Sequence, residues 1–378
     1  MKRLFSFLMF IQLFTLFIPK VYAEEYLKNA KSGILVENST GEILYEKNKS
    51  DRLSIASLTK MMVQIIVLEN IELGKIKWND IVTVSSNASG MGGTQIWLST
   101  GEKMSVKDLF KGMSIVSAND ATVALAEYVS GSEKKFVNLM NEKAKMLGLK
   151  NTFFKNCTGL DEDGHYSSAE DLAIIARELL KHDEILNFSS VYEDYIRVDT
   201  PNKYWLVNTN KLVRFYNGAD GLKTGFTDDA LYTMAVTAKR ENMRLIAIVL
   251  GENDSKTRNN ETVELLNYGF DNYKIDLLKK KNDVIDTVEV DRGTKDKFNV
   301  ILSDDLTVLT KKSNPNVKYD YKILLDEITL PIKKGDIVGK YYLLNNNSEI
   351  KSVDLIVNDD ISKVNYFKYL FKLFVSVI

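Results

Sequence analysis

The stretch from Leu58 to Leu73 limits the possible folds more than any other part of this chain. It is apolar on nearly every side of a helix, with methionine, valine, isoleucine and leucine following one another closely. A helix that is apolar all round has no face for solvent, so it must lie in the centre of a domain. Ser57 and Lys60 stand at its start, and the sequence therefore brings a hydroxyl and an amine into a dry interior.

This Ser-x-x-Lys string can supply a nucleophile and its base. The spacing of three residues places both side chains on one helix face. A serine hydroxyl is a poor nucleophile unless a base within hydrogen-bond reach takes its proton. A lysine can be that base only when neutral, a state favoured by burial and by a nearby cation. Lys60 adjoins the apolar helix, so we expect it to be buried. Lys223 could be the nearby cation that disfavours its charged form. We predict that Ser57 is the nucleophile and Lys60 the base.

The same string also occurs at Ser132–Lys135 and at Ser348–Lys351. The first copy stands beside acidic and basic residues, and the second follows a run of asparagines. Such surroundings are typical of solvated positions. We expect both copies to be exposed and without a catalytic role.

Two further strings complete the candidate site, Ser117-Ala-Asn119 and Lys223-Thr224-Gly225. Ser117 and Asn119 stand at a predicted helix junction, where capping a helix is the alternative role. As functional residues, Ser117 would relay a proton and Asn119 would bind a substrate amide. The Lys223 cation and the Thr224 hydroxyl suit a carboxylate. Gly225 lets an extended ligand approach the strand closely.

The order of the hydrophobic patterns along the sequence divides the chain into a helical part and β-rich parts. Helical spacing comes first and β-rich runs follow residue 211. The predicted first hairpin is Gly33–Tyr45, and the predicted helices are Val106–Ile115, Asn119–Val129, Glu133–Leu147, Ser168–Lys181 and Thr262–Tyr273. A second hairpin joins Ala230–Lys239 to Met243–Leu250.

After a charged break at Lys279–Asp283, short alternating runs predict a small all-β domain over residues 283–356. Its predicted strands are Val284–Val290, Phe298–Leu302, Leu306–Thr310, Tyr319–Leu325 and Tyr341–Leu344.

The two ends of the chain indicate export and a membrane surface. Residues 1–23 combine a basic start, an apolar run and a small-residue cleavage pattern ending at Ala23, which predicts a signal peptide. An uncleaved N-terminal anchor is the alternative. Residues 360–378 mix aromatic residues with lysines and are too short and too charged to span a bilayer. They predict an amphipathic helix that anchors the protein peripherally at the outer face of the cytoplasmic membrane. A helix docked on the protein's own core, or a dimer contact, is the alternative.

Composition excludes several classes of function. The formal net charge of -1 gives no reason to expect nucleic-acid binding. Cys157 is the single cysteine, so no internal disulfide forms. His165 and His182 are the only histidines, and there is neither a His-Glu-x-x-His string nor a Gly-x-Ser-x-Gly elbow. We expect no metal and no cofactor.

From about Ser32 to Phe270 the chain resembles the low-molecular-mass penicillin-binding proteins that are serine-type D-alanyl-D-alanine carboxypeptidases, of the peptidase S11 type. The resemblance rests on the three motifs and on the stretches ASLTKMM, SANDATVALAEYVSG, MNEKAKMLGLKNTFF, GLDEDGHYSSAEDLA, DGLKTGFTD and MRLIAIVLG. It implies an α/β fold of the β-lactamase/transpeptidase type over residues 24–275, a helical cluster beside an antiparallel sheet.

The resemblance also implies a role for each motif residue. Ser57 would be acylated, and its backbone N–H and that of Phe226 would form the oxyanion hole. Thr227 would assist on the same strand. Arg258, in the predicted loop Asn253–Asn260, would bind the substrate carboxylate. His165 matches a family histidine near the cleft and is interpreted as structural.

The implied activity is removal of the terminal D-alanine from peptidoglycan stem peptides, with β-lactams acylating Ser57. A serine β-lactamase is the nearest alternative and needs a Glu-x-x-Leu-Asn string, for which Asp183–Asn187 is an imperfect match. A D,D-endopeptidase and a catalytically silent wall-binding scaffold are the others. The chain departs from the family at Leu231, where glycine is usual, and at Asn156–Gly159, which replaces a turn containing Asn-Pro.

Overall fold

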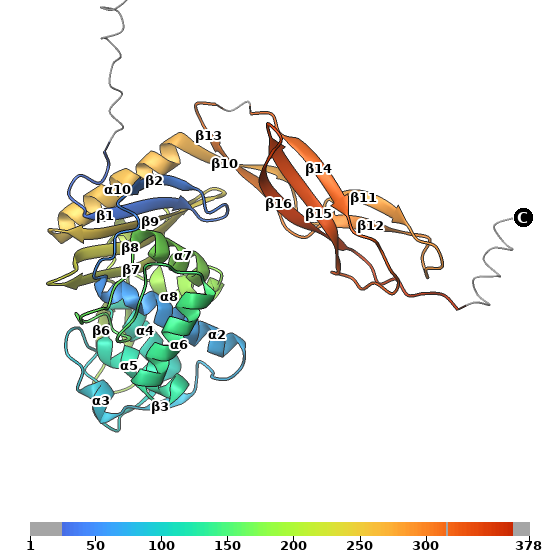
Figure 1. Ribbon diagram of the computed structural model, residues 1–378. Coiled ribbons are helices and arrows are strands. Elements are labelled where there is room, and N and C mark those ends of the chain that lie inside the picture. Colours follow the sequence, from blue (N-terminus) through green and yellow to red (C-terminus); the bar gives the residue numbers. More distant parts are fainter. Residues whose placement is uncertain (1–24, 315–316, 366–378) are drawn as a thin grey trace, which may run out of the picture.

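The computed structural model describes residues 25–314 and 317–365. In Figure 1 a part that mixes helices and strands is followed by an elongated β part. The predicted signal peptide and residues 366–378 of the predicted anchor lie outside the described residues. The domain boundaries 24–275 and 283–356 stay predictions.

A five-stranded antiparallel sheet forms the frame of the first part. Its strand order is β2-β1-β9-β8-β7, so the first and last segments of this part pair in the middle, with Ser32 opposite Leu250. β7 is the terminal strand on one side. The strands are β1 (Ser32–Glu37), β2 (Ile43–Lys47), β7 (Ala219–Thr227), β8 (Leu231–Arg240) and β9 (Met243–Glu252).

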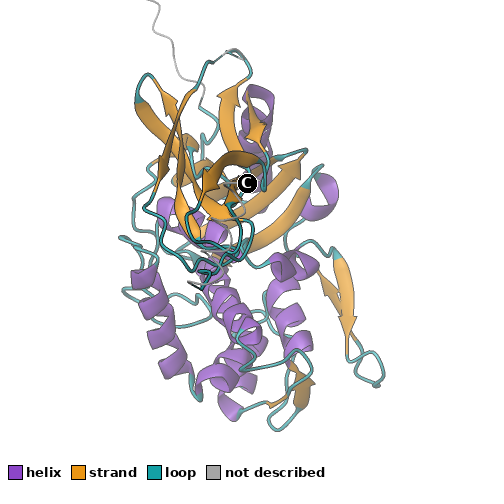
Figure 2. Cartoon of the chain, turned by 90° about the vertical axis from the view of Figure 1, so that its right-hand side faces the viewer, coloured by secondary structure: helices purple, strands orange, loops and turns teal. Residues whose placement is uncertain are grey.

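Helices cover both faces of this sheet (Figures 1 and 2). On β9, Ile246 and Ile248 join the core on the side of the helical cluster, while Ala247 and Val249 join the core beneath α10. A strand buried on both faces is apolar throughout, which explains its unbroken hydrophobic sequence. The helices are η1 (Ala56–Thr59), α2 (Lys60–Glu72), α3 (Ser86–Ser89), α4 (Val106–Ile115), α5 (Asn119–Ser130), α6 (Glu133–Met146), α7 (Ala169–Leu179), η2 (Asp183–Ile185), α8 (Leu186–Ser189), α9 (Leu212–Phe215) and α10 (Ser255–Asn272).

The predicted central helix is confirmed, with one refinement. Every residue of α2 from Lys60 to Leu68 is buried. The predicted first turn is a separate 3₁₀ helix, η1, in which Ala56 has a φ of 47°. The left-handed conformation is costly for alanine, which marks this turn as strained.

The prediction that α10 begins at Thr262 is wrong. The helix begins at Ser255 because Asp254 caps it, accepting hydrogen bonds from the backbone N–H groups of Lys256 and Thr257. Its first turns are polar and largely exposed, so they lack the apolar spacing on which the prediction depended. Arg258 therefore stands on a helix and not in a loop.

Several short strands escaped the sequence prediction because they are polar or half-exposed. They are β3 (Ile81–Thr83), which pairs with β4 (Lys103–Ser105), β5 (Glu193–Ile196), which pairs with β6 (Tyr204–Val207), and β10 (Tyr273–Lys279), which pairs with the predicted strand β13 (Leu306–Lys311). The remaining strands make a five-stranded sheet in the order β11-β12-β16-β15-β14. They are β11 (Val284–Glu289), β12 (Lys297–Leu302), β14 (Asp320–Leu325), β15 (Ile337–Asn345) and β16 (Ser348–Val357).

The predicted C-terminal helix does not begin at residue 360. Ile361 is fully buried and bridges Ile332 in an antiparallel pairing, and Lys363 bridges Gly293. Residues 360–365 thus complete the β part. Among the described residues, none of the helices has the length and apolar character needed to cross a bilayer.

The other two Ser-x-x-Lys copies have structural roles. Ser132 is the N-cap of α6 and accepts a hydrogen bond from the Lys135 N–H. Ser348 is exposed in the β15–β16 hairpin. Lys351 is partly buried and donates to the Thr307 hydroxyl at 2.8 Å, so the expectation of exposure is wrong for this residue.

Candidate active site

Ser57 and Lys60 meet at the junction of η1 and α2. In a 3₁₀ turn, side chains three residues apart lie one above the other. The Lys60 Nζ lies 3.0 Å from the Ser57 Oγ and donates a second hydrogen bond to the carbonyl oxygen of Thr158 at 2.6 Å. Lys60 is fully buried and Ser57 is partly exposed. The amine is therefore hidden behind a hydroxyl that a substrate can reach.

Burial lowers the pKa of Lys60 to about 7, with the neighbouring Cys157 opposing the shift. Its hydrogen-bond partners are a hydroxyl and a carbonyl, and neither carries a charge that would hold the proton on the amine. At neutral pH a substantial fraction of Lys60 is therefore uncharged and able to accept the Ser57 proton.

Lys223 lies on β7 and is also buried, with its Nζ donating to the Thr224 carbonyl at 2.9 Å. Its pKa is well below the ordinary value, first because of burial and then because of repulsion by Lys60 and Arg258. Burial is the main cause of the low pKa of Lys60. Repulsion between like charges is mutual, so a charged Lys223 would also disfavour the charged form of Lys60.

Gly225 brings the β7 backbone against the serine turn. A Cβ atom at this position would lie 2.9 Å from the Ser57 backbone nitrogen and 2.6 Å from the Thr233 Oγ1. Only glycine fits so close an approach. Because β7 is the terminal strand of its sheet, an extended peptide can add to its open side.

Ser117 occupies the junction between α4 and α5, but it does not cap a helix. The N-cap of α5 is Ala118, without a side-chain hydrogen bond. Ser117 has a φ of 68°, and its buried Oγ has no hydrogen-bond partner among the described residues. A strained serine with an unsatisfied hydroxyl is typical of a functional position.

Asn119 and Thr224 tie neighbouring elements to the site. The Asn119 side chain donates to the Gly92 carbonyl at 2.8 Å and so fixes the loop before α4. The Thr224 hydroxyl donates to the Thr209 hydroxyl at 2.8 Å, while the Thr209 N–H donates to the carbonyl of Ile115 at the end of α4. Thr209 thus links β7 to the junction that carries Ser117.

The last three predicted residues extend along β7 and across the sheet. Phe226 is half-exposed and packs on Tyr232, with ring centroids 4.5 Å apart. The Thr227 hydroxyl donates to the Asp161 carboxylate at 2.6 Å. Arg258 donates to the carbonyl of Thr233, the residue opposite Gly225 in the sheet.

The environment of Arg258 differs from the predicted solvated loop. The side chain is only 5 % exposed, and burial lowers its pKa to about 10. Its remaining hydrogen bonds go to the Asn259 side-chain oxygen, at 2.9 and 3.2 Å. No ion pair with a carboxylate forms at Arg258 within residues 25–314 and 317–365. It is a buried cation without a counter-ion.

His165 and Cys157 lie behind the serine turn and have structural roles. The Lys155 N–H donates to His165 Nδ1, so the proton is on Nε2, which donates to the Thr59 hydroxyl at 2.8 Å. Burial lowers the His165 pKa to about 4, so the ring is neutral. Burial also raises the pKa of the Cys157 thiol well above its ordinary value, so Cys157 is a poor nucleophile.

The sequence identified the turn Asn156–Gly159 only as a departure from the family and missed that it receives the Lys60 amine. The Asn156 side chain accepts hydrogen bonds from the backbone N–H groups of Thr158 and Gly159, which aims the Thr158 carbonyl at Lys60. Gly159 has a φ of 82°, and a Cβ there would collide with the carbonyl group of Ala56. The Asn-x-x-Gly spacing was the available signal, because both residue types are typical of tight turns.

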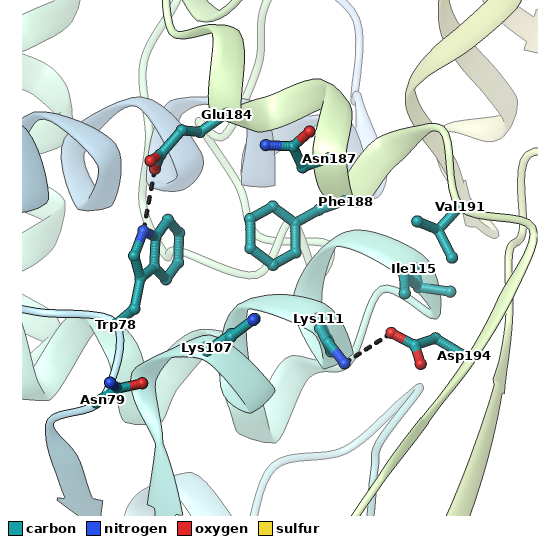
Figure 3. A pocket seen from close by; sticks show the side chains of 10 residues that line it. All are labelled: Trp78, Asn79, Lys107, Lys111, Ile115, Glu184, Asn187, Phe188, Val191 and Asp194. Atoms are coloured by element: carbon teal, nitrogen blue, oxygen red, sulfur yellow. Dashed lines mark hydrogen bonds and ion pairs between the residues drawn. The ribbon is translucent and has the colours of Figure 1, made fainter.

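A separate cavity of about 640 Å³ lies between α4, α8 and the start of β5 (Figure 3). Trp78 donates to Glu184 at 3.1 Å on one side, and Lys111 pairs with Asp194 at 2.7 Å on the other. Asn187 also lines it. Two residues of the candidate β-lactamase string, Glu184 and Asn187, therefore line this cavity, while Asp183, which holds the position of the required glutamate, is exposed. Within the part of the chain that the structure describes, no group of three histidine, cysteine or carboxylate side chains could hold a metal ion.

Comparisons with known proteins give consistent results. Residues 20–254 match the family Peptidase S11, D-alanyl-D-alanine carboxypeptidase, and residues 273–363 match the C-terminal domain of penicillin-binding protein 5. The D-alanyl-D-alanine carboxypeptidase DacF of Bacillus subtilis is 43% identical over 379 residues, covering 98% of this chain and 97% of that protein.

Two solved structures are also similar. Penicillin-binding protein 5 of Haemophilus influenzae superposes with a TM-score of 0.75 at 31% identity, over 91% of this chain and 100% of that one. Penicillin-binding protein D2 of Listeria monocytogenes in its ampicillin-bound form gives a TM-score of 0.59 at 33% identity, over 66% of this chain and 100% of that one.

The low pKa of Lys60 predicts the acid side of the pH profile. Protonation removes the base, so the second-order rate of acylation by benzylpenicillin should fall about tenfold for each pH unit below about 7. Stopped-flow measurements between about pH 5 and pH 9 give the profile, and Lys60→Arg should be inactive throughout because its guanidinium stays charged. A rate that is constant across this range would contradict the assignment.

Gly159 and Gly148 form a matched pair for testing the turn behind Ser57. Both have a positive φ, but a Cβ at Gly148 meets nothing within 4 Å. Each alanine variant should lose about 1–2 kcal/mol of stability from the left-handed conformation. Only Gly159→Ala should also displace the Ala56 carbonyl and slow acylation at least about tenfold, which is about 1.4 kcal/mol of barrier. Equal acylation rates in the two variants would show that the turn does not position Ser57.

Proposed function

Because this chain belongs to the peptidase S11 family of D-alanyl-D-alanine carboxypeptidases, we propose that Ser57 is the nucleophile with which it removes the terminal D-alanine of peptidoglycan stem peptides. The protein is a serine-type hydrolase. The observation that supports the assignment of Ser57 is its 3.0 Å contact with a buried amine whose pKa lies near 7.

The reaction has two steps. The Ser57 Oγ attacks the carbonyl carbon of the penultimate D-alanine while Lys60 takes the hydroxyl proton. The backbone N–H groups of Ser57 and Phe226 stabilise the negative oxygen. The bond to the terminal D-alanine breaks, and the leaving amine receives a proton through Lys60 and Ser117. A water molecule then hydrolyses the ester and restores the free Ser57 hydroxyl.

Substrate binding uses the open side of β7. The stem peptide adds to this edge as an extended strand, and Asn119 binds its amide. Lys223, Thr224 and Arg258 receive the terminal carboxylate. The absence of a counter-ion at Arg258 in the described structure supports this role, because a buried guanidinium gains most from an incoming anion. Thr227 holds the end of the strand through Asp161.

β-Lactams acylate the same serine. The ampicillin-bound Listeria structure covers the domain that carries Ser57 here. A serine β-lactamase is disfavoured because the required glutamate is replaced by Asp183, and because Glu184 and Asn187 of the same string line the separate cavity of Figure 3. An endopeptidase that cuts cross-links would use the same residues, and the intact Ser57, Lys60 and Lys223 argue against a silent scaffold.

We further propose that the protein is exported and held at the outer face of the cytoplasmic membrane by residues 366–378. The support is their composition, in which five aromatic residues accompany Lys368 and Lys372, two cations suited to anionic lipid. The small β domain then separates the catalytic domain from the membrane surface.

Exchange of Ser57 tests the proposed nucleophile. Wild-type protein should release one alanine from a pentapeptide ending in D-alanyl-D-alanine, as observed by mass spectrometry. Ser57→Ala should lose this activity and its covalent labelling by fluorescent penicillin by at least about a thousandfold. Ser132→Ala, in the copy that caps α6, should keep both and lose about 1 kcal/mol of stability. Labelling of Ser57→Ala at the wild-type level would exclude this mechanism.

Truncation tests the proposed anchor. Removal of residues 366–378 spares the buried Ile361 and should move the processed protein into the soluble fraction. Activity on the free pentapeptide should not change. A Lys368→Ser/Lys372→Ser variant should bind anionic vesicles more weakly than wild type at low ionic strength, and the difference should shrink as added salt screens the attraction in wild type. Continued membrane association of the truncated protein would favour an N-terminal anchor instead.

A further inference from the structure

An acidic residue that no motif contains lies behind the substrate-binding arginine. Glu252 is the last residue of β9, and its side chain is fully buried. It stands opposite Tyr232 in the sheet, and the Arg258 guanidinium lies 6.0 Å above the ring of that tyrosine. No N–H group of the described residues reaches either Glu252 carboxyl oxygen.

The partner of Glu252 is another carboxyl group, that of Glu261 on α10. Glu261 already accepts hydrogen bonds from the Asn29 N–H, the Asn29 side chain and the Ala30 N–H, at 3.0, 2.6 and 3.4 Å. With these donors it is the ionised member of the pair, so the shared proton resides on Glu252, which donates it to Glu261. Burial and the negative charge of Glu261 raise the pKa of Glu252 to about 8 and hold it neutral at neutral pH.

This arrangement explains why Arg258 has no counter-ion. Arg258 precedes Glu261 by one helical turn, and Glu252 acts on it electrostatically. An ionised Glu252 would attract the guanidinium electrostatically and so compete with any incoming carboxylate for its positive charge. A neutral Glu252 leaves the positive charge available.

We propose that Glu252 is a positioning residue that, by sharing a proton with Glu261, keeps Arg258 unpaired and ready to bind the terminal carboxylate of the substrate. The inference rests on the proposed role of Arg258 and extends it. Loss of the shared proton at alkaline pH turns Glu252 into a competitor for Arg258, so substrate binding weakens while the chemical step at Ser57 is unaffected.

Charged and titratable groups on the neighbouring elements could also contribute to a pH dependence of substrate binding. α10 contributes Glu261 and Arg258, and β8 contributes Tyr232. Asp254 at the cap of α10 also raises the Glu252 pKa. On the segment before β1, the exposed Lys31 side chain lies over Gly251. Lys223, whose pKa is lowered in part by Arg258, is present in wild type and in the Glu252 variants, so its titration affects both alike.

The experiment measures KM and kcat against pH for a pentapeptide with a free terminal carboxylate and for the same peptide amidated at that end. In wild type, KM for the free acid should rise by about tenfold from pH 7 to about pH 9, because only the fraction with neutral Glu252 binds well. The amidated peptide should not show this rise. Glu252→Gln is neutral at every pH and should abolish the difference, with kcat at pH 7 within about twofold of wild type.

Glu261 provides a second and independent test. Glu261→Gln removes the charge that holds the proton on Glu252, so KM for the free acid should already be raised several-fold at pH 7. The double variant Glu252→Gln/Glu261→Gln should restore the wild-type KM at pH 7. If the single variant raised KM only because the Asn29 contacts were lost, the double variant would not restore it.

Two results would overturn the proposal. One is a pH dependence of KM in Glu252→Gln that coincides with that of wild type. The other is a double variant with a KM as high as that of Glu261→Gln. If wild type releases no alanine from either peptide, the proposed function itself fails, and that outcome is distinct from both.

Discussion

The chemistry of this protein depends on one buried amine. Lys60 enters the apolar core at the start of α2, where its hydrogen-bond partners among residues 25–314 and 317–365 are a hydroxyl and a carbonyl. Burying an amine without a counter-ion costs free energy, and the molecule relieves that cost by releasing the proton. The strained turn at Ala56, the Asn156 turn and Gly225 all act on this junction. The surrounding fold holds a neutral base against a hydroxyl.

The sequence predicted the parts of the fold that have strong hydrophobic periodicity. The buried α2, the amphipathic helices from α4 to α7 and the hairpin of β8 and β9 are such elements. The start of α10 could not be found in this way, because a polar, capped and exposed turn has no apolar spacing. The strands β10 and β16 were also missed, because charged residues interrupt their apolar pattern. The burial of Arg258 depends on β8 and β9, which are brought to it only by the tertiary fold.

Motif residues were easier to predict than the groups that support them. Ser57, Lys60 and Gly225 lie within direct contact. The Thr158 carbonyl has no side-chain signature, because a carbonyl belongs to every residue, and Thr209 lies in no motif although its hydroxyl contacts Thr224. Leu231 shows what a departure from the family costs. Its φ of 55° is a conformation in which the usual glycine is unstrained, whereas leucine loses about 1–2 kcal/mol.

The position of β1 in the sheet has a consequence for export. β1 is made early in synthesis but pairs with β9, at the other end of the catalytic part. Contacts between residues so far apart in sequence form slowly, because a long loop must close first. Under the proposed export, the chain could therefore stay extended during translocation, since its native sheet is complete only after β9 has also emerged.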